Sequence, residues 1–341
     1  MALNYYQRLQ NLQQRKYDPE IRKSLISESF GRGTVPENIE YLLESTKPIP
    51  EDYNAKTIEA ANRVQKHLER DFNLHFGRAY RMQGSVRTKT NIKTHSDIDL
   101  LTIVDRYHYV GAGVPNNEPY TASNPDEDII ELRKQATRIL KLKYAIVDDS
   151  GSKCISIRNQ NLKKEVDIVF AFWLNSKQFH DNNSDEYYRG IYLYDFPKKQ
   201  RESDYPFATI GQVNSKGTAT NDGSRKGIRL LKNLRADNEK IELNSFQLTS
   251  IVHSIDGSQL IYKQSGNEIT IAQSISTELS KLIEDRNYRI NVQSPNGLEN
   301  PLEKDEIVVH LKNIKSDLDQ LIIDCAGEFK NSVLQKAILT Y

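Results

Sequence analysis

Three aspartates lie in apolar stretches of this sequence, where a carboxylate is costly to bury. Asp97 and Asp99 begin the run SDIDLLTIVD, and Asp167 lies inside KKEVDIVFAFW. Because side chains alternate along a strand, Asp97 and Asp99 should point to one face, with their Cα atoms about 6.5 to 7 Å apart. Desolvation and mutual repulsion both oppose the ionisation of such carboxylates. A bound cation would compensate for this cost, so the three residues are candidates for a metal site.

A Gly-Ser pair completes the pattern, although an isolated Asp-x-Asp would be more typical of an exposed strand end or turn. Gly84 and Ser85 follow the strand-like RAYRMQ. A glycine there lets the backbone approach a ligand, and serine offers a hydroxyl and an N–H to phosphate oxygens. Carboxylates are hard oxygen ligands for Mg²⁺, and the third aspartate can orient or deprotonate an attacking hydroxyl. The set predicts metal-assisted phosphoryl transfer.

These residues need a sheet to hold them. Period-two segments that predict strands are RAYRMQ, SDIDLLTIVD, KCISIRN, KKEVDIVFAFW and RGIYLYDF. Between and before them, AKTIEAANRVQKHLERDF places Ile58, Ala61, Val64 and Leu68 on one helical face, and NPDED begins a second helix at about 125 to 142. We therefore expect a mixed α/β lobe with one sheet.

From about Pro206 the pattern becomes helical and stays so. The helix GSRKGIRLLKNLRAD places Arg225, Arg229 and Lys232 on one face at spacings of four and three residues. Cationic residues on such a helix usually form a solvated face, and this is the plain alternative to a phosphate-binding role. The C-terminal lobe should be almost entirely α-helical.

Composition excludes several classes of function. The 341 residues carry 47 Lys and Arg against 46 Asp and Glu, a formal net charge of +1, so activation by a long nucleic acid is not expected. Neither a secretory signal nor a run of about 20 apolar residues is evident, so we expect a cytoplasmic protein without a membrane segment. Cys154 and Cys325 show no zinc-site spacing and should be reduced, buried thiols.

The order Gly-Ser, Asp-x-Asp and distal Asp resembles the nucleotidyltransferases of the DNA polymerase β superfamily. GSVRTKTNIKTHSDIDLL with Thr90 and Ile92, VDIVFAFW, RLLKNL and LNSFQLTSIV are similar to one branch of it, the CD-NTases, or cGAS/DncV-like enzymes. The similarity runs from about residue 55 to the end. Only the Gly-Ser and three-Asp set is specific, while the later segments agree in type and order.

The resemblance implies a role for each site residue. Asp97, Asp99 and Asp167 would be the catalytic metal ligands for Mg²⁺, with Mn²⁺ as a substitute. Gly84 and Ser85 would hold the nucleotide triphosphate. Lys232 matches the lysine that reaches the triphosphate in similar enzymes, where it would offset charge that Mg²⁺ leaves unneutralised.

The resemblance also implies an α+β, bilobal fold: a polymerase β-like nucleotidyltransferase lobe with a mixed sheet and an all-α C-terminal lobe, with the active site in the cleft between them. We expect an N-terminal helical segment, residues 1–50, that packs across both lobes. The nucleotidyltransferase core should span residues 51–205, and the C-terminal helical domain residues 206–341.

The function that follows is a bacterial enzyme that condenses nucleoside triphosphates, ATP and a second one, into a cyclic di- or oligonucleotide and releases pyrophosphate. The implied setting is CBASS-type antiphage signalling, with a cyclic-nucleotide-responsive effector and regulatory protein partners. Two alternatives stay open: a nucleotidyltransferase that adds NMP to an RNA 3′ end, a protein or a small molecule, and an inactive nucleotide-binding sensor or scaffold. An intact acidic triad argues against the scaffold, since unused clustered carboxylates would only destabilise it.

Four polar or aromatic residues near these motifs receive plainer interpretations. His95 is more typical of a packed bystander than of a ligand or base. Tyr192 and Tyr194 in RGIYLYDF could stack a base, but aromatic residues are also enriched in strands, and the strand interpretation is favoured. Ser245 in LNSFQLTSIV is predicted to be a helix N-cap.

Overall fold

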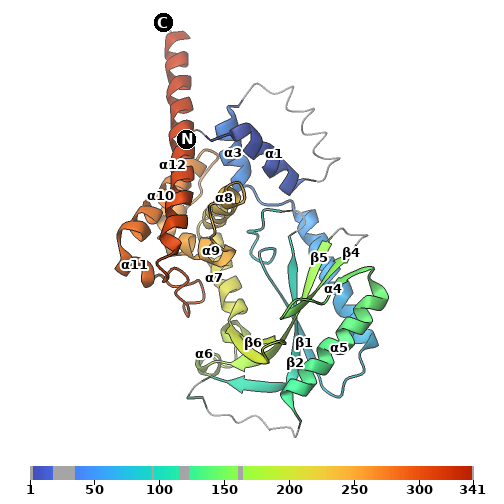
Figure 1. The fold of residues 1–341 in the computed structure, drawn as a ribbon. Helices are drawn as coiled ribbons and strands as arrows, with labels where there is room; N and C mark the ends of the chain where they lie inside the picture. The colour runs from blue at the N-terminus through green and yellow to red at the C-terminus, as the bar shows by residue number, and fades with distance from the viewer. Residues whose placement is uncertain are drawn as a thin grey trace. The chain divides into compact units, whose positions relative to one another are not determined.

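The structure is a computed structural model that describes residues 3–17, 35–93, 96–111, 113–114, 123–159 and 164–339. Its residues group into two compact units. The sheet unit comprises Pro50–Lys89 and His95–Gly211, and the helical unit comprises Met1–Ile49, Thr90–Thr94 and Gln212–Tyr341. The predicted α+β fold with a mixed-sheet lobe and a helical lobe is confirmed (Figure 1).

One mixed sheet organises the sheet unit. Strands β2 and β5 pair in parallel and the other neighbours are antiparallel, in the order β1-β2-β5-β4-β3, with β6 against β5 and β7 against β6. The described strands are β1 (Arg78–Gln83), β2 (Ile98–Val110), β3 (Ile146–Asp148), β4 (Cys154–Asn159), β5 (Lys164–Asn175), β6 (Gly190–Asp195) and β7 (Gln200–Asp204). All five segments predicted as strands are strands.

Two short strands were not predicted. Strand β3 has three residues and β7 reads QRESD, a polar sequence with four exposed positions. Both lie at an edge of the sheet, where one side of the strand has no neighbour to bury it. Because β3 and β7 bury few side chains, their sequences carry no clear hydrophobic alternation.

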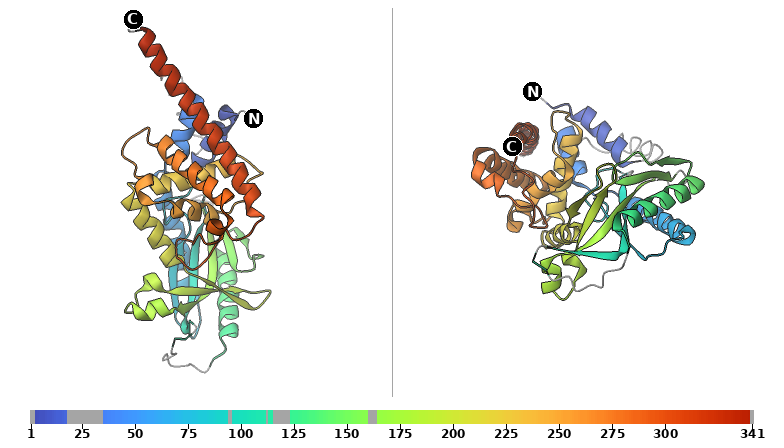
Figure 2. Two further views of the ribbon diagram at one scale, coloured as in Figure 1. Left: turned by 90° about the vertical axis from the view of Figure 1, so that its left-hand side faces the viewer. Right: turned by 60° about the horizontal axis from the view of Figure 1, so that its bottom comes forward.

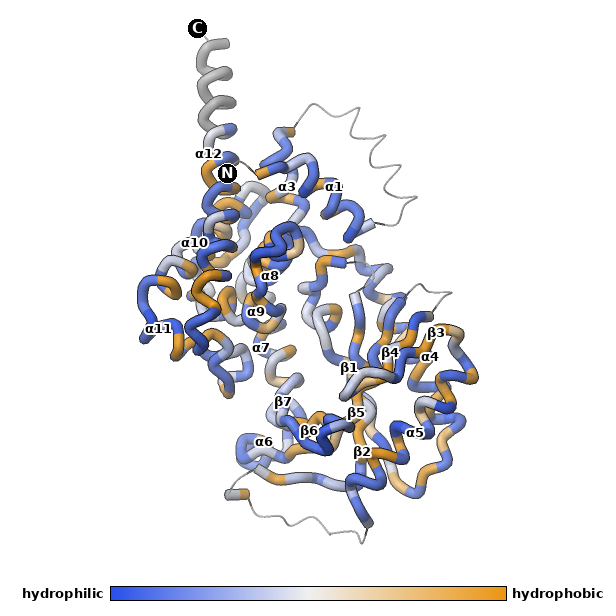
Figure 3. Tube along the Cα trace, viewed as in Figure 1, coloured by the Kyte–Doolittle hydropathy of each residue, from blue (hydrophilic) through white to orange (hydrophobic). Residues whose placement is uncertain are grey.

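Helices α4 (Glu51–Asp71) and α5 (Pro125–Lys143) cover one face of the sheet (Figure 1). The end signals of α5 agree with its sequence: the Asn124 side chain accepts hydrogen bonds from the first turn, proline follows it, and lysines occupy the last turn. The core under both helices includes Val64, Leu68, Leu100 and Ile168, all fully buried. In Figure 3 the two helices alternate between hydrophobic and hydrophilic stretches, as expected of helices with one buried face.

The opposite face of the sheet carries a smaller apolar cluster. It includes Leu101, Ile103, Val169 and Trp173, which lie at alternate positions of β2 and β5. Asp99 occupies the next alternate position of β2 toward its start, on this same face. The alternation therefore directs the first carboxylate of β2 away from α4 and α5.

The helical unit contains most of the remaining helices. Helices α10 and α12 run side by side in both views of Figure 2. Its elements are α1 (Tyr5–Lys16), α3 (Glu37–Thr46), α7 (Pro206–Ala219), which begins in the sheet unit, α8 (Gly223–Ala236), α9 (Ser245–Ser254), α10 (Glu268–Glu284), α11 (Arg286–Ile290) and α12 (Ile307–Leu339). No helix among the described residues is both long and apolar enough to cross a membrane.

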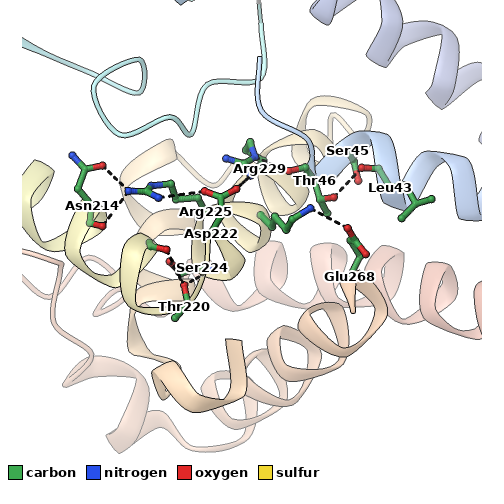
Figure 4. A network of polar contacts seen from close by, with 12 residues as sticks. Leu43, Ser45, Thr46, Asn214, Thr220, Asp222, Ser224, Arg225, Arg229 and Glu268 are labelled. Atoms are coloured by element: carbon green, nitrogen blue, oxygen red, sulfur yellow. Dashed lines mark hydrogen bonds and ion pairs between the residues drawn. The ribbon is translucent and has the colours of Figure 1, made fainter. Parts of the chain in front are cut away.

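Helix α8 is buried on both sides, which the sequence did not indicate. Arg229 is fully buried, and its Nε donates a hydrogen bond of 2.6 Å to the carbonyl oxygen of Thr46, while its other end pairs with Asp222. Lys226 pairs with Glu268 across 2.9 Å (Figure 4). The alternative of a solvated cationic face is therefore wrong for this helix, because Arg229 and Lys226 are buried and each meets an acceptor on another helix.

Gly223 at the start of α8 should tolerate no side chain. A Cβ built there would lie 1.7 Å from the carbonyl oxygen of Leu260, a backbone atom that cannot move alone. We expect Gly223→Ala to lower the free energy of unfolding by about 3 kcal/mol or more, as measured by urea denaturation. The control is Gly327→Ala inside α12, where nothing lies within 4 Å, which should be neutral or stabilise by about 0.5 to 1 kcal/mol. Equal stability of the two variants would contradict this packing.

Candidate active site

The parallel pairing of β2 with β5 brings two of the predicted carboxylates together. Asp99 is the second residue of β2 and stands directly opposite Asp167 of β5. Asp97 immediately precedes β2. Residues 68 positions apart in the sequence thus become neighbours on one face of the sheet, next to the point where β2 begins.

Gly84 lies directly after β1, the other strand that pairs with β2. Strand β1 pairs with β2 so that Gln83 stands opposite Asp99, and Gly84 follows at once. Gly84 has a φ of +100°, and a Cβ built on it would lie 3.7 Å from Asp99 Oδ2 and 3.8 Å from the carbonyl oxygen of Asp97. Such a φ favours glycine, so the residue type, the turn and the close approach to the carboxylates are explained together.

The turn after Gly84 is held by its own hydrogen bonds. The Arg87 amide donates to the carbonyl oxygen of Gly84 at 3.1 Å, and the Thr88 hydroxyl donates to the carbonyl oxygen of Ser85 at 3.2 Å. Ser85 therefore lies in a defined turn, directly after the glycine whose built Cβ would approach Asp99 and Asp97. The sheet unit assembles five of the six predicted site residues: Gly84, Ser85, Asp97, Asp99 and Asp167.

The electrostatics of the site favour an added positive charge. Desolvation raises the pKa of Asp97 to about 6, helped by a hydrogen bond with Glu165 and by the charges of Asp167 and Asp99. Desolvation also raises the pKa of Asp99 to about 6, with the Asp167 charge as the next cause. Glu165, two residues before Asp167 on the same face of β5, was not predicted as part of the site, although its alternation with Asp167 was visible in the sequence.

Two uncharged side chains hold the carboxylates. Ser156 of β4 stands opposite Asp167, and its Oγ donates a hydrogen bond of 2.6 Å to Asp167 Oδ1. The Gln83 side chain hydrogen-bonds Asp99 and opposes the rise of its pKa. Sequence reasoning missed both residues, because their roles depend on the register of β4 and β1 against their neighbours, which no local pattern reports.

The donor set is chemically suited to a hard divalent cation, since carboxylate oxygens are the ligands that Mg²⁺ prefers. Within the described ranges, however, no three His, Cys, Asp or Glu side chains close around one point that could hold a metal ion. The carboxylates are therefore neighbours that repel one another rather than a finished cage.

Lys232 belongs to the helical unit and is almost entirely buried, with 4% of its surface exposed. Its Nζ donates to the carbonyl oxygen of Thr90 at 3.2 Å and contacts the Thr90 hydroxyl at 3.4 Å. Burial lowers its pKa to about 7, with smaller contributions from Arg235 and Arg229. Its expected contact with a triphosphate stays a prediction.

The plainer interpretations have mixed outcomes. Tyr194 is fully buried and its ring packs edge-on against Phe172, which confirms the strand interpretation for this part of β6. The N-cap of α9 is Asn244, whose side chain accepts from the Gln247 amide, so the prediction for Ser245 was wrong by one residue. His95 lies outside the described residues.

The cysteines agree in part with expectation. Both are free thiols. Cys325 is fully buried, whereas Cys154 on β4 is only partly buried, so the prediction of a buried thiol was wrong for Cys154.

No family model matches the chain, but individual proteins and solved structures are similar to it. A c-di-GMP synthase of a Lachnospiraceae bacterium is 32% identical over 294 residues, which cover 77% of this chain and 83% of that protein. The solved STING-associated CdnE c-di-GMP synthase of Capnocytophaga granulosa has a TM-score of 0.80 and 27% identity, and covers 96% of this chain and 100% of its own.

A more distant structure has the same fold. CdnE c-UMP-AMP synthase of Rhodothermus marinus, solved with Apcpp and Upnpp, has a TM-score of 0.64 at 17% identity and covers 84% of this chain and 96% of its own.

The raised pKa of Asp99 predicts that this residue destabilises the metal-free protein at neutral pH. Because the pKa of Asp99 is raised to about 6 in the folded protein, this carboxyl ionises at lower pH in the unfolded chain than in the folded one. The folded protein therefore loses stability as the pH increases from the ordinary pKa of aspartate, near 4, to about 6. Asp99→Asn should therefore raise the free energy of unfolding at pH 8 by up to about 3 kcal/mol, and by much less at pH 4. Thermal denaturation in EDTA at both pH values measures this.

The exposed Asp181→Asn provides the matched control and should change stability by less than about 0.5 kcal/mol at either pH. A loss of stability in Asp99→Asn at pH 8 would show that the site carboxylates are compensated in the free protein.

Proposed function

This chain belongs to the CD-NTase family of nucleotidyltransferases, and from that premise we propose that it joins two molecules of GTP into c-di-GMP. The observation that carries the proposal is the register that sets Asp99 beside Asp167, next to Gly84, where a built Cβ would lie 3.7 Å from Asp99 Oδ2. The names of the relatives, c-di-GMP synthases, supply the choice of base. In this proposal GTP takes the place of the ATP that the family resemblance implied.

The reaction consists of two nucleotidyl transfers. In each, a ribose hydroxyl of one nucleotide attacks the α-phosphorus of the other, a P–O ester bond forms, and the bond to pyrophosphate breaks. The hydroxyl loses its proton, and pyrophosphate leaves with the bonding electrons. Two GTP thus give one c-di-GMP and two pyrophosphates.

The chain's own residues would contribute position and charge. The turn at Gly84 and Ser85 offers backbone amides and a hydroxyl to the phosphate oxygens, on the side of the carboxylates that no Cβ blocks. Asp167, fixed by the Ser156 hydroxyl at 2.6 Å, can accept or orient the proton of the attacking hydroxyl. The fixed strand pair keeps these groups in place before the substrate arrives.

Mg²⁺, or Mn²⁺ in its place, would be held by Asp97, Asp99 and Asp167. When bound, the ion supplies charge that lowers the cost of deprotonating the hydroxyl and stabilises the leaving pyrophosphate. Support comes from the raised pKa values of Asp97 and Asp99, which indicate carboxylates lacking sufficient positive charge. Because the described side chains do not form a closed cage, substrate phosphates are expected to supply the remaining ligands.

Lys232 remains a predicted ligand of the triphosphate on the strength of the resemblance. Its ammonium would have to exchange the Thr90 oxygens for phosphate oxygens, since it is buried against Thr90 in the structure.

The signalling role extends beyond the chain itself. One similar structure is named STING-associated. We infer that the cyclic product of this enzyme acts on a separate cyclic-nucleotide-responsive effector in antiphage defence. Cytoplasmic location and regulatory protein partners belong to the same proposal.

Incubation of the purified protein with each nucleoside triphosphate singly and in pairs, with Mg²⁺, tests the proposal. We expect GTP alone to give a phosphatase-resistant product with the mass of c-di-GMP, and Asp97→Ala and Asp99→Ala to reduce its rate by at least about 1,000-fold, since they remove charge compensation at the reacting phosphate. Products that require ATP would contradict the choice of base. Linear products or acceptor-dependent transfer would favour the alternative nucleotidyltransferase, and no turnover would favour the scaffold.

Ser156→Ala tests the support of the third carboxylate. Without the hydroxyl, Asp167 loses a hydrogen bond that orients it toward the site, and metal affinity should fall by about 10-fold. Mn²⁺ binding measured by electron paramagnetic resonance on the nucleotide-free protein reports this directly. Ser203→Ala, on the exposed strand β7, is the control and should leave binding unchanged. Equal affinities of the two variants would remove Ser156 from the site.

A further inference from the structure

Three consecutive residues between the Gly-Ser turn and the acidic pair are buried in the helical unit. Thr90, Asn91 and Ile92 expose 2%, 3% and 6% of their surfaces, and we call this segment the strap. The strap lies within Thr90–Thr94, which groups with the helical unit, whereas the chain up to Lys89 and from His95 onward belongs to the sheet unit. The chain that connects the two halves of the motif is therefore held by helices.

The contact that holds the strap comes from Lys232. Its Nζ lies 3.2 Å from the Thr90 carbonyl oxygen and 3.4 Å from the Thr90 hydroxyl. With 4% of its surface exposed, Lys232 offers little of its ammonium to solvent. Burial also lowers its pKa to about 7, which reflects a site from which water is largely excluded.

Helix α8 provides a firm base for this lysine. One turn earlier, Arg229 pairs with Asp222 and donates a hydrogen bond to Thr46 of α3, and Lys226 pairs with Glu268 of α10 (Figure 4). Asn233, next to Lys232, donates to the carbonyl oxygen of Ser45 at 2.9 Å. Breaking a buried ion pair is costly, so α8 is anchored on either side of Lys232.

The strap connects to the phosphate-binding turn through a short stretch of chain. Thr90 follows Ser85 by five residues. Within them, the Thr88 hydroxyl donates to the Ser85 carbonyl oxygen and the Lys89 amide donates to the Val86 carbonyl oxygen. Lys89 has a φ of +56°, a conformation that few non-glycine residues adopt unless their surroundings impose it. Fixing Thr90 therefore restricts where Ser85 can lie.

We propose that Lys232 is a positioning residue that acts through Thr90: it fixes the strap, and through the strap it fixes the Gly84-Ser85 turn. This inference rests on the proposed function, in which that turn holds the triphosphate. It differs from direct binding of the triphosphate by Lys232, because the Lys232 ammonium contacts the Thr90 backbone carbonyl in the nucleotide-free protein. Loss of the contact misplaces the turn, and a displacement of about 1 Å can reduce turnover about 100-fold.

Hydrogen exchange on the nucleotide-free protein tests the positioning without any appeal to activity. In Lys232→Met, amides of residues 85–93 should exchange about 10-fold faster than in the wild type, and in Thr90→Val, which removes one of the two acceptors, by a smaller factor. Lys16→Met is the matched control: Lys16 is another buried lysine of the helical unit whose Nζ donates to a backbone carbonyl, that of Glu44, but it does not touch the strap.

Unchanged exchange of residues 85–93 in both test variants would overturn the proposal, whatever the enzyme makes. Lys16→Met should leave this segment at the wild-type rate, and faster exchange there would also overturn it, since loss of any buried lysine would then suffice. If Lys232→Met does not fold, hydrogen exchange of residues 85–93 is measured on Thr90→Val and Lys232→Arg instead. Arginine can still donate to the Thr90 carbonyl oxygen and should restore most of the protection.

Steady-state kinetics with GTP then separate positioning from direct binding. Positioning predicts that kcat falls about 10- to 100-fold in Lys232→Met while KM changes less than about threefold, and that adding Thr90→Val causes little further loss. A large rise in KM with kcat unchanged, and a Thr90→Val variant that behaves like the wild type, would overturn the proposal in favour of a direct triphosphate ligand. Absence of any cyclic product in the wild type would refute the proposed function but leave the exchange result standing.

Discussion

The hydrogen bonds between β2 and β5 force two carboxylates to be neighbours although they repel each other. Asp99 and Asp167 stand opposite each other in the parallel pairing of β2 with β5, so their backbones cannot separate without breaking the hydrogen bonds between these strands. Burial opposes the ionisation of Asp99, and the Asp167 charge adds to the effect, so the pKa of Asp99 is raised to about 6. The apolar core of the sheet unit offsets the free-energy cost of holding these two carboxylates together.

Burial of apolar side chains on the opposite face of β2 and β5 stabilises the strands that hold the two carboxylates. Leu100 and Ile168, next to the two aspartates in sequence, are fully buried under α4 and α5. Strand alternation makes both conditions compatible, since one face can be core while the other ends in carboxylates. The uncharged donors Gln83 and Ser156 then hold the acidic groups without neutralising them, which leaves their negative charge available to a cation.

The helical unit shows a different use of buried polar groups. Arg229 pairs with Asp222, the N-cap residue of the same helix, and Lys226 pairs with Glu268 of α10. The ammonium of Lys232, by contrast, is directed at a backbone carbonyl and a hydroxyl. These two acceptors are neutral, and a neutral acceptor compensates a buried charge less well than an ion pair does. Lys232 gives the strap a fixed point, and a triphosphate would be a stronger partner for its ammonium. Membership of the CD-NTase family fits both a positioning role and a triphosphate-binding role for this lysine, which differ in their effect on hydrogen exchange of the strap.

The sequence by itself determined the class of fold and the type of chemistry, and it predicted the candidate site residues that belong to recognisable local patterns. Asp97, Asp99, Asp167, Gly84 and the strands that carry them follow from hydrophobic alternation and turn chemistry, which depend only on nearby residues. Tertiary structure alone decided that Ser156 holds Asp167, that Gln83 meets Asp99 and that Lys232 lies against Thr90. Those contacts depend on strand register and on packing between residues up to 142 positions apart, and no local pattern encodes either.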